Sequence, residues 1–299
     1  MFSAGIISYS GEKKFKIPYW KVAGALSNFP VVINPADLWA TTLAQAQSLR
    51  LYQWGVEIAR DVITKNKARF KAGSLSDSVD NVFTYTMDWV SSDYGASDTY
   101  GRNNVYTAYK AFYDFASGNS NDRTGNGYNG TDSNITYSGD YASFNGSSSK
   151  IINSSYNTKS YIAIGNTIAT NKLCTYVNDA VWRNQWSTTI TTNTFHQLWY
   201  TYNGTTVSHI EDGSIADTFS RSWWATKSIV SYCYPTRVSS ENYVMDSDNA
   251  NIQIWYRNGS GWYEWRIYSL YIKENTLSSS RITTEYTNQS DPSSFITVL

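Results

Sequence analysis

The sequence is poor in cysteine and histidine, the residues behind disulfide frameworks and much metal chemistry. Of 299 residues, two are cysteine and two are histidine. Cys174 and Cys233 are too few for a disulfide framework and lack metal-ligand spacing, so idle or buried thiols are the simplest interpretation. No Gly-x-Ser-x-Gly motif and no Cys/His cluster accompanies His196 or His209, which argues against a Ser-His-Asp triad or a zinc site. We expect His196 to pack beside the strand that carries Trp199.

The chain also lacks an excess of charge and any long apolar run. Lys and Arg together number 24, and Asp and Glu together number 24. No net field would steer a polyanion to the protein, which disfavours nucleic acid as a partner. No apolar run approaches the ~18 residues that a membrane span needs, and residues 1–10 lack the features of a signal peptide. We expect no membrane partner, and release within an assembled particle if the protein works outside a cell.

Aromatic and small polar side chains are plentiful instead. Aromatic residues make up 16% of the chain, with 25 Tyr and 12 Trp, while charged residues make up only 16%. This composition favours β structure over disorder or a coiled coil. The length favours two domains of ordinary size. We therefore expect an all-β protein of two domains.

Residues 194–220 carry the clearest local pattern, which predicts a β-meander. Residues 195–202 are aromatic and β-branched, and Asn203-Gly204 is a dipeptide suited to a tight hairpin turn. Two further strands are expected around a second turn at Asp212-Gly213.

The residues of this meander resemble the central hairpins of laminin-G-like, concanavalin A-like lectin domains. That fold is a jelly-roll sandwich of two antiparallel sheets. Residues 118–131 and 139–146 are similar to the loop after the first strand of these domains and to their next strand. The resemblance implies a fold and no active site, because in that family the matching positions are mostly structural. Those positions are His196, Trp199, Tyr202, Gly204, Asp212 and Gly213.

The first third of the chain alternates short strands with polar turns. In residues 82–90, apolar and aromatic side chains alternate with Thr and Asp, so one face of this strand is the core side. A further resemblance is to an uncharacterised β-sandwich family that precedes laminin-G-like domains in bacterial surface proteins and bacteriophage virion proteins. The usual ending of that family is altered here to Asp93-Tyr94-Gly95-Ala96. The segments that carry the resemblance are 26–33, 46–52 and 93–98.

Together the two resemblances imply a small N-terminal β-sandwich over residues 1–107 and a laminin-G-like/concanavalin A-like lectin domain over residues 108–299. Residues 286–295 resemble the tail with which this domain pair ends. Short helical segments are expected at 37–46 and 278–286, and a last hairpin is expected from 251–256 and 262–272.

The carboxylate pattern of a jelly-roll glycosidase is absent from the sequence. Such enzymes place acids at i, i+2 and i+4 on one strand face, because a retaining pair stands about 5–5.5 Å apart. The nearest pattern, Asp246-Ser247-Asp248, has no Glu in register. We expect no enzyme, and a glycoside hydrolase of the concanavalin A-like fold stays open as an alternative.

The polar loop 118–131 is a candidate calcium site. Hard cations take carboxylate and carbonyl oxygens on loops, and Asp122, Asn126 and Asn129 supply such groups. The resemblance to laminin-G-like domains also implies calcium near their loops. Turn-forming Asx side chains are the alternative, and no cofactor is required.

Aromatic side chains are the candidates for glycan binding. Tyr and Trp faces stack on sugar rings and also dominate protein interfaces, whereas packing inside the sandwich is the alternative. The candidates are Trp223, Trp224, Trp255, Tyr256, Trp262, Tyr263 and Tyr128.

We therefore expect a non-enzymatic structural or adhesion protein of a bacteriophage virion, as a capsid decoration, fibre or tail component at the particle surface. The jelly roll would bind a host cell-surface glycan weakly and in many copies. The N-terminal domain, with few loop aromatics, would dock on other virion proteins. The particle assignment rests on the resemblance. A free-standing extracellular carbohydrate-binding module is the remaining alternative.

Overall fold

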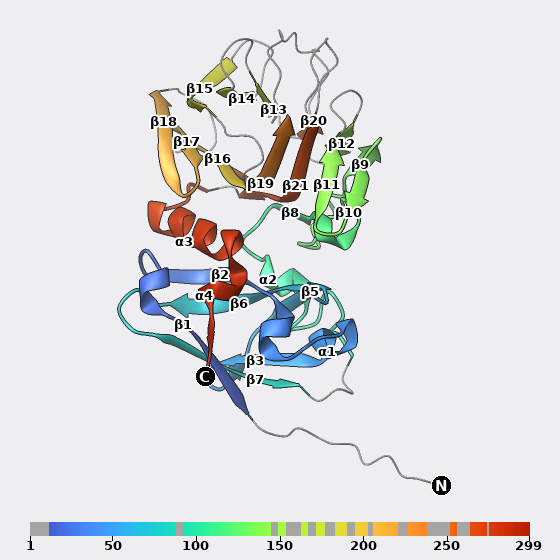
Figure 1. Cartoon of the computed structure of the whole chain (residues 1–299), viewed down its shortest axis with the longest axis vertical. Helices are drawn as coiled ribbons and strands as arrows, with labels where there is room; N and C mark the ends of the chain where they lie inside the picture. The colour runs from blue at the N-terminus through green and yellow to red at the C-terminus, as the bar shows by residue number, and fades with distance from the viewer. Residues whose placement is uncertain are drawn as a thin grey trace. The chain divides into compact units, whose positions relative to one another are not determined.

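The computed structural model describes residues 12–87, 92–144, 149–153, 163–166, 172–176, 183–189, 195–202, 206–220, 227–237, 252–255, 264–273 and 275–299. These residues form antiparallel sheets and a few helices, which confirms the predicted all-β class. The chain divides into two compact units (Figure 1). The first unit comprises Met1–Thr107 with Ser280–Leu299, and the second comprises Ala108–Ser279.

The first unit contains two antiparallel sheets, with strand orders β22-β1-β7-β3-β4 and β2-β6-β5. Its strands are β1 (Lys13–Ile17), β2 (Leu26–Ile33), β3 (Leu49–Gln53), β4 (Val56–Glu57), β5 (Arg60–Thr64), β6 (Lys67–Leu75), β7 (Asn81–Met87) and β22 (Thr297–Val298). Its helices are the 3-10 helices η1 (Tyr19–Lys21) and η2 (Pro35–Leu38), and α1 (Leu43–Ser48), α2 (Arg102–Val105), α3 (Ser279–Ser290) and α4 (Pro292–Phe295).

Aromatic rings from both sheets form the core of the first unit. Phe15 of β1 stacks on Phe83 of β7 with ring centroids 5.1 Å apart, and Phe70 of β6 meets both rings edge-on. In β7 the buried residues alternate with less buried ones, as the sequence predicts for this strand. This alternation places one face of the five-stranded sheet against the three-stranded sheet.

The helix expected over residues 37–46 is wrong, because two short helices occupy this region. η2 ends at Trp39, whose φ of 67° lies in the left-handed region and stops the helix. A new helix, α1, then begins with a capping box, in which Thr42 and Gln45 each accept a hydrogen bond from the backbone of the other.

The C-terminal tail belongs to the first unit, which corrects the predicted second domain of residues 108–299. Figure 1 shows α3, α4 and β22, in red, beside the blue strands β1 and β2. The side chain of Asn288 accepts a hydrogen bond from the Val32 N–H at 2.7 Å and donates one to the Val32 carbonyl at 2.9 Å. Both backbone groups of Val32 on the open edge of β2 are therefore hydrogen-bonded. Phe295 is fully buried, and β22 pairs with β1. The helix predicted over 278–286 is present and longer.

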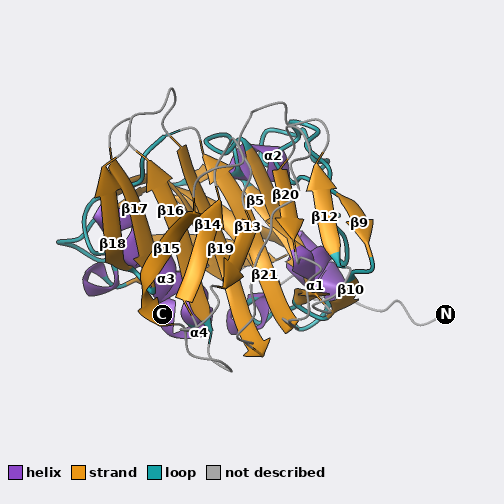
Figure 2. Cartoon of the chain, turned by 90° about the horizontal axis from the view of Figure 1, so that it is seen from above, coloured by secondary structure: helices purple, strands orange, loops and turns teal. Residues whose placement is uncertain are grey.

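The second unit is built around one large antiparallel sheet, with the order β10-β11-β21-β19-β16-β17-β18 and with β8 paired to β21. Figures 1 and 2 show the small sheet β13-β14-β15 lying over a face of this sheet, so the unit has two layers. A further small sheet has the order β20-β12-β9.

The strands of the second unit are β8 (Ala111–Asp114), β9 (Thr131–Ser133), β10 (Thr136–Ser138), β11 (Tyr141–Phe144), β12 (Lys150–Asn153), β13 (Ala163–Asn166), β14 (Lys172–Tyr176), β15 (Arg183–Thr189), β16 (His196–Tyr202), β17 (Thr206–Glu211), β18 (Ser214–Ser220), β19 (Lys227–Arg237), β20 (Ile252–Trp255) and β21 (Glu264–Lys273). A 3-10 helix, η3 (Phe115–Ser117), follows β8.

The predicted meander is confirmed, since β16, β17 and β18 pair in sequence order. The predicted last hairpin is wrong. β20 pairs with β12, whereas β21 pairs with β19 along one edge and with β11 and β8 along the other. Both edges of β21 are occupied, so β20 finds its partner in another sheet.

Among the described residues, no helix is long and apolar enough to cross a membrane.

Candidate functional site

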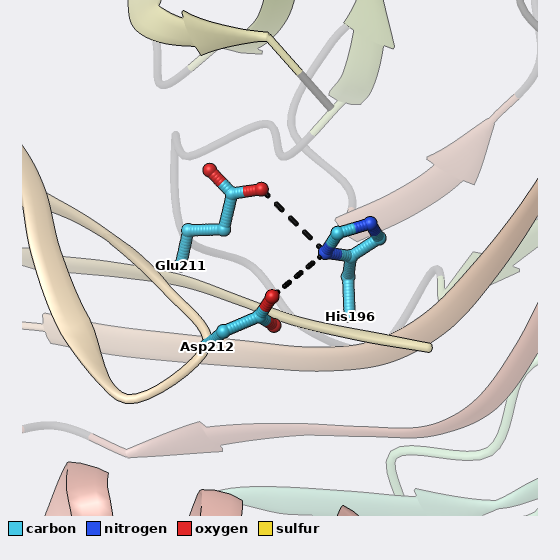
Figure 3. A group of neighbouring side chains, drawn as sticks. All are labelled: His196, Glu211 and Asp212. Atoms are coloured by element: carbon cyan, nitrogen blue, oxygen red, sulfur yellow. Dashed lines mark hydrogen bonds and ion pairs between the residues drawn. The ribbon is translucent and has the colours of Figure 1, made fainter. Parts of the chain in front are cut away.

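Three side chains meet at the turn between β17 and β18 (Figure 3). His196 begins β16, Glu211 ends β17, and Asp212 is the first residue of the turn. The Nδ1 atom of His196 lies 2.9 Å from Oδ2 of Asp212 and 3.5 Å from Oε1 of Glu211. In the part of the chain that the structure describes, this is the one group of three or more His, Cys, Asp or Glu residues with metal-ligand proximity.

The Asp212-Gly213 turn places the carboxylate. Asp212 and Gly213 have φ values of 51° and 80°, the left-handed pair that the tight turn requires. The Asp212 N–H donates to the Gln197 carbonyl at 3.0 Å, and the Gln197 N–H donates to Oδ1 of Asp212 at 2.9 Å. One carboxylate oxygen is therefore held by the backbone, and the other is directed at His196.

The ring of His196 is buried, with 3% of the residue exposed, whereas both carboxylates retain some access to solvent. The sequence predicts a structural His196 in this strand. The residue does lie in β16, but its ring faces two acids that sequence reasoning did not connect with it. The hairpin register could have indicated the meeting, since Leu198 pairs with Glu211 and places His196 beside the next turn.

The three candidate calcium ligands lie together in the loop after η3. Asp122 is 5% exposed, and its carboxylate accepts hydrogen bonds from the N–H groups of Phe112, Thr124 and Tyr128 and from the Thr124 hydroxyl. Asn129 Oδ1 accepts from the Asp122 N–H at 2.9 Å.

The third residue, Asn126, uses its Nδ2 to donate to the carbonyls of Tyr109 and Lys110. These hydrogen bonds hold the loop against β8 without a cation. They agree with the alternative that the sequence left open, in which the Asp and Asn side chains form turns. A calcium ion would have to displace N–H donors from Asp122, so the residues do not fit calcium well. Calcium at this loop stays a prediction.

The glycan-binding candidates fall largely outside the described residues. Trp223, Trp224, Tyr256, Trp262 and Tyr263 lie there, as do Asp246 and Asp248. Trp255 is the last residue of β20. Tyr128 is half-buried, its carbonyl accepts from the Tyr113 hydroxyl at 2.6 Å, and Lys110 Nζ lies 5.4 Å from its ring centroid.

Three tryptophans of the first unit have exposed side chains, contrary to the expectation of few loop aromatics there. Trp20, Trp39 and Trp54 are 66%, 65% and 77% exposed. Trp54 and Gly55 form the two-residue turn between β3 and β4, with φ values of 53° and 77°. A Trp-Gly pair between two strand patterns indicates a turn-tip side chain, and this signal was missed.

Strand register gathers Trp20 and Trp54 at one end of the five-stranded sheet. Ile17 of β1 pairs with Asn81 of β7, and Gln53 of β3 pairs with Phe83, so the end of β1, the start of β7 and the β3–β4 turn lie together. The exposed apolar residues at this end, which we call the apolar rim, are Tyr19, Trp20, Trp54, Val56, Val79 and Val82.

Hydrogen bonds fix the backbone of the apolar rim. The Tyr19 N–H donates to Asp80 Oδ1 at 3.2 Å, and Lys16 Nζ donates to Asp80 Oδ2 at 2.7 Å. The Asp80 carboxylate thus ties the turn after β1 to the turn before β7, and these contacts hold its pKa below the usual value. Trp39 lies toward the other end of β1, with Lys13 Nζ 5.4 Å from its ring.

No family model and no curated protein matches the chain. Among solved structures, the chain is similar to domain 4 of AbnA, a GH43 extracellular arabinanase from Geobacillus stearothermophilus, in complex with arabinotriose. The match has 18% identity and a TM-score of 0.37, and it covers 60% of this chain and 98% of that chain. A similarity at this level does not establish a common fold.

Proposed function

We propose that the protein is a non-enzymatic structural and adhesion protein of a bacteriophage virion, docked on another virion protein through the apolar rim of its first unit. The observation that carries the docking proposal is the exposure of Trp20 and Trp54 at one end of one sheet. The virion itself is inferred from the resemblance of the sequence to laminin-G-like virion proteins.

The composition of the apolar rim favours a protein partner over a sugar at this place. Polar groups do lie beside the rings, since Lys21 Nζ is 4.7 Å from the Trp20 ring centroid, but the rim adds the aliphatic side chains of Val56, Val79 and Val82, which a sugar does not need. Exposed aliphatic and aromatic side chains gathered in one patch are typical of protein interfaces. Tryptophans at the centre of such interfaces often contribute about 2 kcal/mol or more each.

The rim is also well prepared for docking. Trp54 sits on a two-residue turn whose backbone is set by Gly55, and the backbone of Tyr19 is anchored to Asp80. A partner would therefore not have to order these segments on binding, which lowers the entropic cost of association.

For the second unit we retain the proposal of weak binding to a host cell-surface glycan through its aromatic residues. A single aromatic–sugar stack contributes on the order of 1 kcal/mol, whereas a millimolar site needs about 4 kcal/mol. We therefore expect several contacts in a site of near-millimolar affinity, and many copies for useful binding. The test is a glycan array probed with the full chain multimerised on beads. Binding that survives loss of Trp223, Trp224, Trp262 and Tyr263 together would exclude these side chains as its source.

The docking test uses particles of the phage that encodes the chain. Wild-type chain is expected in purified particles, whereas chain with Trp20→Ser and Trp54→Ser is expected to be depleted at least tenfold. Trp39→Ser is the matched control, because it removes an indole of similar exposure away from the rim. Absence of the wild-type chain from particles contradicts the virion proposal, and normal incorporation of the double variant contradicts docking through the rim.

A reducing-sugar assay over a polysaccharide panel tests the enzyme alternative. Turnover that disappears on changing Asp246 or Asp248 would overturn the non-enzymatic assignment.

A further inference from the structure

We propose that His196, Glu211 and Asp212 form a binding site for a first-row divalent metal ion such as Zn²⁺, which clips the start of β16 to the β17–β18 turn. The three side chains offer one imidazole nitrogen and two carboxylate oxygens within 4.8 Å of one another. The site is independent of the apolar rim and of the loop with Asp122.

Two carboxylates face one nitrogen of His196, and a single N–H cannot donate a good hydrogen bond to both. A proton on Nδ1 makes one good hydrogen bond, to Asp212 at 2.9 Å, and the 3.5 Å separation from Glu211 is too long for a second. Among the described residues, the Glu211 carboxylate has no hydrogen-bond partner. A second acid directed at the same buried nitrogen is therefore left for a cation to bind.

Two of the three distances between the ligand atoms are close to those between ligands of one metal ion. Two ligand atoms that each lie about 2.1 Å from a metal, at octahedral to tetrahedral angles, are about 3.0–3.4 Å apart. The two observed distances from His196 Nδ1, 2.9 and 3.5 Å, lie close to this interval. Small shifts of the partly exposed carboxylates would complete the geometry.

Charge and support from the backbone also fit a divalent ion. With a neutral His196, the two carboxylates give the site a charge that a divalent cation would cancel. The Gln197 N–H already holds Oδ1 of Asp212, the kind of outer hydrogen bond that orients a metal-ligating carboxylate.

The donor set selects the class of metal. An imidazole nitrogen beside two carboxylates suits Zn²⁺ and its first-row neighbours, whereas Ca²⁺ takes six to eight oxygens and Mg²⁺ keeps most of its waters. The partial exposure of Glu211 and Asp212 leaves room for water as a further ligand.

The test is a titration of the chelator-treated full chain with Zn²⁺, followed by calorimetry and by thermal unfolding. We expect one saturable site, a rise in unfolding temperature on saturation, and at least tenfold weaker binding for Glu211→Gln. Asp140→Asn, which removes an exposed carboxylate of the same unit, is the matched control and is expected to bind as the wild type does. Co²⁺ in place of Zn²⁺ should give a visible absorption spectrum that His196→Gln abolishes.

Two outcomes overturn the proposal. Equal Zn²⁺ affinity in the wild type and in Glu211→Gln places the metal elsewhere, for example on the cysteine thiols. Stabilisation of the same size by Ca²⁺ or Mg²⁺ shows general carboxylate binding and no selective site. Glu211→Gln changes a partly exposed side chain without a hydrogen-bond partner among the described residues, so this variant is expected to fold and to keep the comparison valid.

Discussion

The two units of this protein offer two different kinds of candidate site. The first unit fills its core with phenylalanines and places Trp20 and Trp54 in solvent at turn tips. In the second unit, the candidate residues Asp122 and His196 are nearly buried and each faces several partners. Buried polar side chains also occur in the first unit, for example Arg69, but the candidate surface of that unit is apolar and exposed. The comparison separates two kinds of candidate site: an exposed apolar surface suited to a partner, and a buried polar cluster suited to an ion or to a structural role.

The largest expected effect comes from the tail that closes the first unit. Phe295→Ala should cost about 3–5 kcal/mol, because Phe295 is fully buried in the core of that unit. Hydrogen exchange measured segment by segment should show faster exchange in residues 12–87 and no change in the β16–β18 meander. Leu299→Ala, at an exposed position, is the control and should change stability by less than about 0.5 kcal/mol. Equal destabilisation of both units would contradict the assignment of the tail.

The tail also shows where sequence reasoning ended. The strands of the meander and its Asp212-Gly213 turn were predicted, because such turn dipeptides have local conformational preferences that depend on few neighbours, whereas Asn203-Gly204 lies outside the described residues. The partner of α3 was not predicted, because the pairing of Asn288 with Val32 joins positions 256 residues apart. Nothing in either segment alone encodes that contact.

Features that depend on one strand were predictable from the sequence, whereas features that depend on how strands pair were not. Burial on alternate positions of β7 followed from the period of two along one strand. The pairing of β20 and β21 with different strands did not follow from a pattern along one strand, since it depends on which edges other strands already occupy. The meeting of His196 with Glu211 likewise needs the register of two strands, which residue patterns specify only loosely.

A second prediction concerns the inward polar groups of the second unit. Asp122→Ala should cost about 3 kcal/mol, because several buried donors lose their acceptor at once. Chemical denaturation followed by hydrogen exchange in residues 108–144 measures the loss. Asp140→Asn is again the control. A calcium-dependent gain in stability that Asp122→Asn removes would give this loop the cation role that the sequence suggested, and a cost below about 0.5 kcal/mol would refute the structural role.

A third prediction concerns alkaline pH. Burial, together with the hydrogen bond from the Tyr94 hydroxyl to Glu57, raises the pKa of Tyr94 to about 12 from 10.0. Because the folded state resists ionisation of this phenol, the stabilising contribution is complete below pH 10 and is lost as the pH rises through about 12. Tyr94→Phe should therefore flatten the alkaline fall in stability of the first unit alone. An unchanged alkaline profile in this variant would show that Tyr94 is not responsible.

The smallest expected effect is on the stability of the isolated chain when the apolar rim is altered. Trp54→Ser should change the free energy of unfolding by no more than about 0.5 kcal/mol, since the indole is 77% exposed. Thermal unfolding checks this. A larger loss would mean that the rim serves the fold of the first unit and not a partner.

The most direct test of the docking proposal is oxidative footprinting of the tryptophans in the free chain and in intact particles. In the free chain, Trp20, Trp39 and Trp54 should oxidise at similar rates, because their exposures are similar. In the particle, Trp20 and Trp54 should be protected at least tenfold while Trp39 stays reactive. Equal oxidation of all three tryptophans in the particle would contradict docking through the apolar rim.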